Sequence, residues 1–329
     1  MMETNDTLVL LEKNYQLIGE TNAKWLDKRV KYLLARIFTG KEQQINQEKF
    51  NWLDVALSRK AGLITSLTRN SRHTLAGLMV ANDKATVDDI EGLYFNKKLL
   101  RDNGFKASNS TYFAAYQLFS IESEHRESIV KRAHELFQLV KKNHPFIVNM
   151  NDYSMVVSLA QSPQLAELMV FEIESLVEFY FNHLRKIGMK SNESCLIVAT
   201  LATLMTGKKD SELVGCFDDV VGYLEENKIK IRNSHYIPII SIAFLEQQTK
   251  AVALDELVSF IEEVSRNISL IFETEFKQAL AISLYAEQLS NKLAQTPLTT
   301  LSVSFNQLII EEQTMLVSNA ANMMSHYIE

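Results

Sequence analysis

The chain has 329 residues, of which 47% are hydrophobic and 22% are charged, the balance of a folded globular protein and not of a disordered one. A net charge of −6 argues against a protein whose main task is to coat nucleic acid, because that task requires a basic surface. With only 10 Gly and 4 Pro, the chain lacks the turn residues that a β-rich fold of this size needs. We therefore expect long helices joined by short polar loops.

The N-terminal residues have neither the basic region nor the apolar core of a signal peptide. The longest uncharged apolar run, residues 195–205, is too short to cross a membrane. We therefore expect a cytoplasmic protein that has no membrane partner. Cys195 and Cys216 are too few for a disulfide framework and are expected to be reduced. A first helix is predicted over residues 8–19.

A short marker that begins with Asn recurs along the chain at intervals of 39 to 42 residues. Asn is a good N-cap, because its side chain accepts a hydrogen bond from a free backbone N–H in the first helical turn. Each marker thus predicts the start of a helix. The markers begin at Asn70, Asn109, Asn151, Asn192 and Asn233, at Thr274 with Thr in place of Asn, and in a weaker copy at Asn22.

The helix after each marker is expected to be buried on most of its surface. Residues 194–205, for example, carry no charge, and a helix that is apolar nearly all round must be covered on most sides. The second helix of each pair has charges on one face and apolar residues on the other, as in an outer helix with one face in water. Such outer helices are predicted over residues 87–100, 122–142, 165–186, 211–227 and 254–271.

Two of the outer helices end in a glycine, Gly104 or Gly188. We expect each glycine to adopt the left-handed backbone conformation that ends a helix. The apolar residue after it, Phe105 or Met189, is expected to make the apolar contact that accompanies such a helix end.

These helix pairs predict an all-α protein, one domain of tandem helical hairpins of about 41 residues that form an α/α superhelix, or solenoid. A closed ring of inner and outer helices, an α/α toroid, fits the same pattern. We favour the open form, because no loop is long enough to build a lid over a toroid active site. Residues 1–66 are expected to form divergent N-terminal helices, 67–295 the regular hairpins, and 296–329 a C-terminal capping helix centred on 305–327.

The residues around the markers are similar to those of a known family. Residues 63–72 read LITSLTRNSR and residues 98–108 read KLLRDNGFKAS. Together they resemble an uncharacterised bacterial family of about 320-residue all-helical proteins, catalogued as a domain of unknown function. The resemblance extends over nearly the whole chain, and it implies no activity and no functional residues.

No catalytic residue, metal or cofactor is predicted. His134 and Glu135 open a segment like a zinc-protease helix, but Gln138 stands where the second His is needed. The pairs Asp88-Asp89 and Asp218-Asp219 resemble the Mg²⁺-binding acids of ring-shaped helical enzymes. Acids in the first turn of a helix also complement its dipole, and we interpret both pairs in that way.

Two sets of residues are candidates for binding a partner. Basic residues recur at the ends of the outer helices, and stacked repeats would line them along one edge as a groove for an acidic partner. Cations at that position also complement the helix dipole. Rings recur just after several of the markers, where they either form a row for a peptide or pack against the preceding loop. The candidates are Lys98, Lys142 and Lys186 for the basic edge, and His73, Tyr112, Tyr153 and Tyr236 for the row of rings.

These surfaces favour a non-enzymatic interaction or scaffold protein that binds a protein or a peptide. Nucleic acid is a poor fit to the acidic net charge. The alternatives are an enzyme with an α/α-toroid active site and a regulator that binds a small molecule.

Overall fold

The computed structural model describes residues 4–62, 65–250, 252–268, 270 and 273–292. Within these residues the regular structure is entirely helical, with fourteen α-helices and three short 3-10 turns. The predicted all-α class is therefore confirmed. None of the described helices is long and apolar enough to cross a membrane.

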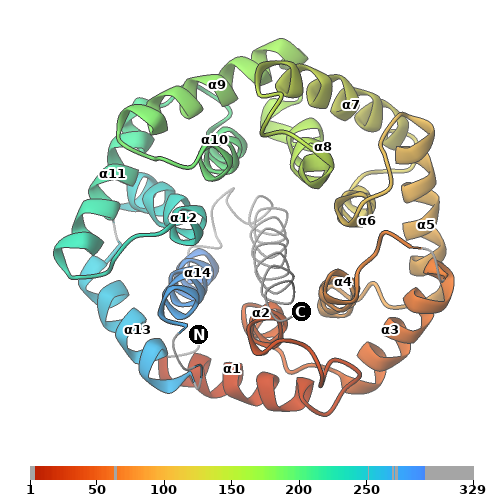
Figure 1. The fold of residues 1–329 in the computed structure, drawn as a ribbon, viewed down its shortest axis with the longest axis horizontal. Helices are drawn as coiled ribbons and strands as arrows, with labels where there is room; N and C mark the ends of the chain where they lie inside the picture. Colours follow the sequence, from red (N-terminus) through yellow and green to blue (C-terminus); the bar gives the residue numbers. More distant parts are fainter. Residues whose placement is uncertain (1–3, 63–64, 251, 269, 271–272, 293–329) are drawn as a thin grey trace, which may run out of the picture.

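The helices form two concentric layers, and successive helices alternate between them (Figure 1). The outer helices are α1 (Thr4–Ile18), α3 (Gln47–Ala61), α5 (Val87–Asp102), α7 (Arg126–Asn143), α9 (Val170–Lys186), α11 (Ser211–Glu226) and α13 (Leu254–Asn267). The inner helices are α2 (Lys28–Thr39), α4 (Arg69–Ala81), α6 (Asn109–Gln117), α8 (Tyr153–Gln161), α10 (Asn192–Thr206), α12 (Asn233–Thr249) and α14 (Thr274–Lys292). The 3-10 turns are η1 (Leu118–Ser120), η2 (Met150–Asp152) and η3 (Pro163–Leu165).

The two layers differ in burial as their sequences predict. In α10 every residue from Ser194 to Met205 is buried, so this helix is covered on all sides. In α13 the buried residues recur at helical spacing on one face, and charged residues occupy the other. The inner layer thus holds the centre of the core, and the outer layer separates that core from water.

The predicted helix starts are close to those observed, but at α6 and α10 the cap is the residue before the Asn. Ser108 and Ser191 cap α6 and α10 with their hydroxyl groups, and the Asn that follows each is the first helical residue. The amide of Asn109 instead accepts a hydrogen bond from the backbone N–H of Thr68, 2.7 Å away in the preceding hairpin. This Asn therefore joins two repeats, a role that a capping argument does not contain.

The weak first copy of the marker does not begin a helix. Asn22 lies in the turn before α2, where its backbone N–H donates to the side chain of Asn51 at 2.8 Å. The cap of α2 is Asp27, which accepts from the N–H of Arg29.

The glycine helix ends are confirmed. Gly104 and Gly188 have φ of +95° and +105°, in the left-handed region that glycine adopts without strain. The residues that follow them, Phe105 and Met189, are buried and donate backbone hydrogen bonds to Leu100 and Leu184. Each contact fixes where the chain turns from the outer to the inner layer.

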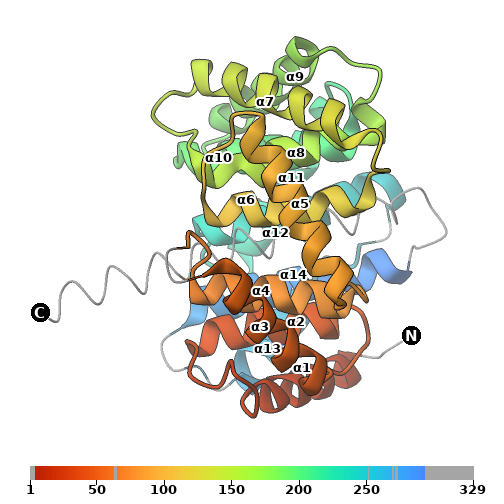
Figure 2. The same cartoon turned by 90° about the vertical axis from the view of Figure 1, so that its right-hand side faces the viewer.

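The predicted α/α superhelix is confirmed. Its first and last helices contact each other, so the observed form is the closed ring, the α/α toroid, and not the open solenoid. Each inner helix contacts the next, α14 contacts α2, and α13 contacts α1. Figures 1 and 2 show the ring along its axis and from its side. The preference for an open form rested on loop lengths, which do not decide closure because the ends meet helix against helix.

Two groups of contacts close the inner layer. The guanidinium of Arg36 on α2 donates to the carboxylate of Glu287 on α14, with nitrogen–oxygen distances of 2.7 and 3.3 Å. Asn291 of α14 donates to the carbonyl of Gly40, just after α2, at 3.0 Å. We call Arg36, Gly40, Glu287 and Asn291 the closure contacts. The predicted C-terminal capping helix, 296–329, lies outside the described residues.

Candidate interaction surface

The predicted row of rings lies between the two helical layers. His73, Tyr112 and Tyr153 are buried, and Tyr236 is half-buried against the core. Each ring lies beside a ring of an outer helix: Phe50 beside His73, Tyr94 beside Tyr112, Phe137 beside Tyr153 and Phe217 beside Tyr236. The rings therefore support packing between layers, and the three buried ones offer a partner no surface in this arrangement.

His73 belongs to a buried polar cluster that joins α3 to α4. Its Nδ1 lies 2.7 Å from the carbonyl of Arg69, and its Nε2 lies 3.6 Å from the carboxylate of Asp54. The same carboxylate accepts a hydrogen bond from Arg72 at 2.7 Å. Burial lowers the pKa of His73, although the charge of Asp54 opposes this shift. The cluster therefore holds a neutral ring at neutral pH and fixes the start of α4.

Tyr112 and Tyr153 are each held by hydrogen bonds and ring contacts. The ammonium of Lys97 donates to the hydroxyl of Tyr112 at 2.7 Å and lies 4.2 Å from the centre of its ring. The hydroxyl of Tyr153 accepts from the backbone N–H of Lys106 at 3.1 Å, and its ring meets that of Phe105 edge-on at 4.8 Å. Both tyrosines thus connect one hairpin to the next.

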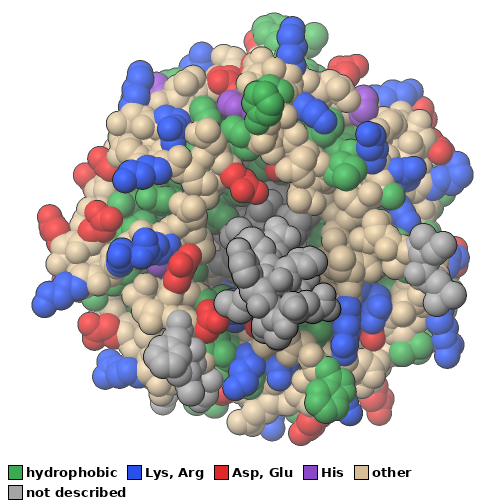
Figure 3. Space-filling view, viewed as in Figure 1, with side chains coloured by type: hydrophobic (Ala, Val, Ile, Leu, Met, Phe, Trp, Pro, Cys, Tyr) green, Lys and Arg blue, Asp and Glu red, His purple; other side chains and the backbone are tan. Residues whose placement is uncertain are grey.

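The three lysines of the predicted basic edge are exposed, one on each of three successive outer helices. Lys98 lies near the end of α5 and forms an ion pair with Asp102 one turn later. Lys142 and Lys186 lie in the last turns of α7 and α9, and neither makes an ion pair with a described residue. Figure 3 shows basic and acidic side chains mixed on one face of the ring, so no single charge covers that face.

Among the described residues, the most exposed aromatic side chain lies in a loop that the sequence patterns did not single out. Phe146 follows α7 and is 100% exposed, and Met150, at the start of η2, is 41% exposed. Lys141 and Lys142 precede them in the last turn of α7. We call residues 141–150 the α7–α8 corner, which lies on the same side of the ring as the α5–α6 connection (Figure 2). The available signal was a Pro-Phe pair directly after a basic helix end.

The α7–α8 corner is held in one shape by its own backbone. The N–H of His144 donates to the carbonyl of Val140 at 2.9 Å, and the N–H groups of Ile147 and Val148 return to the carbonyl of His144 at 3.1 and 3.0 Å. The ring of His144 packs 4.6 Å from that of Phe181 and contacts the carboxylate of Glu178 on α9. Phe146 is therefore presented to solvent by an ordered loop.

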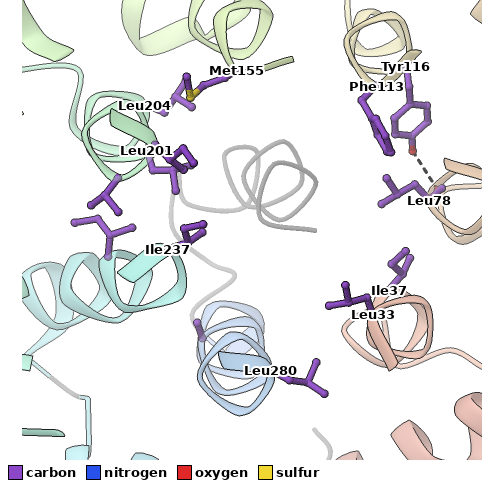
Figure 4. Packing of buried hydrophobic residues seen from close by; sticks show 14 of the residues in the cluster. Leu33, Ile37, Leu78, Phe113, Tyr116, Met155, Leu201, Leu204, Ile237 and Leu280 are labelled. Atoms are coloured by element: carbon purple, nitrogen blue, oxygen red, sulfur yellow. Dashed lines mark hydrogen bonds between the residues drawn. The ribbon is translucent and has the colours of Figure 1, made fainter. Parts of the chain in front are cut away.

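Buried apolar side chains fill the contacts between neighbouring inner helices. Figure 4 shows side chains of Leu, Ile, Met and aromatic residues on the inner helices, directed toward the ring interior or toward the neighbouring inner helix. The hydroxyl of Tyr116 on α6 donates to the carbonyl of Leu78 on α4 at 3.1 Å, so this hydrogen bond joins two neighbouring inner helices.

The paired acids have structural positions. Asp89 completes a capping box with Thr86 at the start of α5, and Asp88 lies in the same first turn, as interpreted from the sequence. Asp218 and Asp219 lie in the middle of α11, so the prediction that they open a helix is wrong. Among the described residues, no group of three or more His, Cys, Asp or Glu could hold a metal ion.

Comparison with known proteins gives a family but no activity. The sequence profile of a family described as a protein of unknown function, DUF4003, matches residues 14–314. An uncharacterized protein of Bacillus subtilis (strain 168), YeaA, is 19% identical over 277 residues, which are 82% of this chain and 80% of that protein. No solved structure matches. The resemblance to an uncharacterised bacterial family is confirmed.

Proposed function

The chain belongs to the DUF4003 family of proteins of unknown function, and we propose that it is a non-enzymatic interaction protein. In this proposal the α7–α8 corner binds a protein or peptide partner, and the ring serves as the rigid support of that corner. The observation that carries the proposal is the complete exposure of Phe146 on an ordered loop.

The energetic argument rests on what a partner gains at this position. Burying a phenyl side chain that is fully exposed contributes about 1.5–3 kcal/mol. Because hydrogen bonds already hold the loop, little conformational entropy is lost when it binds. An aromatic anchor on a preordered loop is the kind of residue that dominates interface energies.

The charge of the corner indicates the chemistry of the partner. Lys141 and Lys142 are exposed directly before the loop, and Lys142 makes no ion pair with a described residue. An acidic group on the partner would find a cation beside the aromatic anchor, which speeds association and selects against basic partners. The proposed ligand is therefore an acidic peptide segment of a partner protein. An apolar side chain or pocket of that partner would contact Phe146.

A peptide-display selection against the full chain tests the proposal. We expect the selected peptides to combine an apolar residue with Asp or Glu. Their affinity, measured by fluorescence anisotropy, should fall about tenfold to a hundredfold in Phe146→Ser and further in Phe146→Ser with Lys142→Glu. The control is Phe95→Ser, because Phe95 is a phenyl group 63% exposed on α5. Equal binding by the Phe146 and Phe95 variants would contradict the proposal.

A further inference from the structure

A second exposed apolar site lies where the chain returns from α8 to α9. Met169, the N-cap of α9, is 63% exposed, and Phe171, in the first turn of that helix, is 62% exposed. Glu167 is also exposed and makes no ion pair with a described residue. We call residues 162–171 the α8–α9 corner. This corner combines an exposed apolar surface with an acidic charge.

The α8–α9 corner is held in one shape by an arginine of α7. The guanidinium of Arg132 donates to three carbonyls of the loop, at 2.5 to 3.0 Å: those of Leu165, Ala166 and Leu168. The backbone N–H of Met169 donates to the carboxylate of Glu172 at 2.7 Å, which fixes the first turn of α9. Because the loop is already ordered, little conformational entropy is lost when it binds a partner.

The two corners are opposite in charge, and both present an exposed phenyl group. The α7–α8 corner presents Phe146 beside Lys142, and the α8–α9 corner presents Phe171 close to Glu167. A contact between the two corners would bury apolar surface on both sides and bring opposite charges together. The α8–α9 corner thus has the chemistry of the ligand proposed above, an acidic segment with an apolar side chain.

We propose that the partner of the α7–α8 corner is the α8–α9 corner of a second copy of this chain, bound head to tail. The first corner leads into α8 and the second follows it, so they lie at opposite openings of the ring (Figure 1). The nine residues of α8 separate them by about 14 Å, so the two corners of one ring cannot bind each other. Because the two surfaces differ, each added copy leaves one corner of each kind free. This inference names the partner of the surface described under the proposed function and rests on that function.

The outer helices contribute to the same polarity of the ring. All six outer helices from α3 to α13 have an acid in the first turn, and five of the six have a base in the last turn. Since these helices run in the same direction, their acids lie toward the opening of the α8–α9 corner and their bases toward the other opening. Charges of other elements mix with them on the face shown in Figure 3, so the contrast is partial. Head-to-tail stacking turns the bases of one ring toward the acids of the next.

Analytical ultracentrifugation of the full chain tests the proposal. As the protein concentration rises to about 0.5 mM at low salt, the average mass should exceed that of a dimer, because the contact is small and open-ended. Phe146→Ser and Phe171→Ser should each raise the dissociation constant about tenfold to a hundredfold. The control is Phe95→Ser, which removes a phenyl group that is 63% exposed on α5 and should leave association unchanged. A wild-type chain that stays monomeric, or an equal effect of Phe95→Ser and Phe171→Ser, would overturn the proposal.

A mixture of two variants tests the head-to-tail arrangement itself. Phe146→Ser retains an intact α8–α9 corner, and Phe171→Ser retains an intact α7–α8 corner. The mixture should therefore form a one-to-one complex that grows no further, although each variant alone stays monomeric at the same concentration. A mixture that also stays monomeric would overturn the head-to-tail contact.

The display selection described above separates this inference from the proposed function. If selected peptides bind the wild type and lose affinity in Phe146→Ser while the wild type stays monomeric, the proposed function stands and the second copy is not the partner. If the chain associates through both corners, the inference and the proposed binding surface are supported together.

Discussion

Removal of the carboxylate of Glu287 is expected to destabilise the ring more than the loss of any surface ion pair. The side chains of Arg36 and Glu287 are 0% and 6% exposed, and their closest nitrogen and oxygen are 2.7 Å apart. Glu287→Ala takes the carboxylate from a buried guanidinium, and breaking a buried pair in this way costs about 3–5 kcal/mol. The free energy of unfolding should fall by that amount, because the two residues join the first inner helix to the last.

Urea denaturation followed by circular dichroism measures this loss. The control is Glu262→Ala, which removes an acid from an exposed pair with Arg266 on α13, 3.9 Å apart. Exposed pairs of this kind contribute about 0–1 kcal/mol. The double variant Arg36→Met with Glu287→Leu should recover most of the lost stability, because apolar side chains replace both charges. A loss in Glu287→Ala no larger than that in Glu262→Ala would refute the reasoning.

Three further predictions concern stability. Gly40→Ala should lower the unfolding free energy by about 1–3 kcal/mol, because its Cβ would lie 2.6 Å from a carboxylate oxygen of Glu287. A double-mutant cycle should show a smaller loss in the Glu287→Ala background, where that oxygen is absent. Burial raises the pKa of Asp152 from 3.8 to about 6, so the protonated carboxyl stabilises the fold below about pH 4 and this stability is lost as pH rises through 6. Between pH 4 and pH 7, the unfolding free energy of Asp152→Asn should therefore rise by roughly 2–3 kcal/mol relative to that of the wild type. Parallel pH profiles of the two proteins would contradict this. Phe146→Ser should change the unfolding free energy by less than about 0.5 kcal/mol, because its side chain has no buried contact to lose.

The helices could be predicted from the sequence because their signals are local. The outer helix predicted over residues 211–227 is observed as Ser211–Glu226, since its apolar face repeats at helical spacing. The left-handed Gly104 and Gly188 were also predictable, because the apolar residue that follows each glycine completes a known helix end.

The cap position was displaced by one residue for a physical reason. The amide of Asn109 accepts a hydrogen bond from the backbone of the preceding hairpin, whereas Ser108 caps the helix. A recurring residue type shows that the position is used in each repeat, but it does not say by which partner. The rings of Tyr112 and Tyr153 illustrate the same point, since both recur and both pack inside the protein.

Closure and the exposed corner could not be predicted from local patterns. Arg36 and Glu287 are 251 residues apart, and neither stands in a motif that indicates a partner. Phe146 lies in a short loop, where an apolar residue normally turns back to the core. Its exposure depends on how His144 and the loop backbone are held, which only the three-dimensional arrangement contains.

Small-angle X-ray scattering of the full chain measures most directly whether the seven hairpins close on themselves. A compact, closed particle of this length should have a radius of gyration of about 20 Å. Its distance distribution should be symmetric and should fall to zero without a long tail. A clearly larger radius with an extended tail would mean that α14 does not meet α2, and the closed ring would be contradicted.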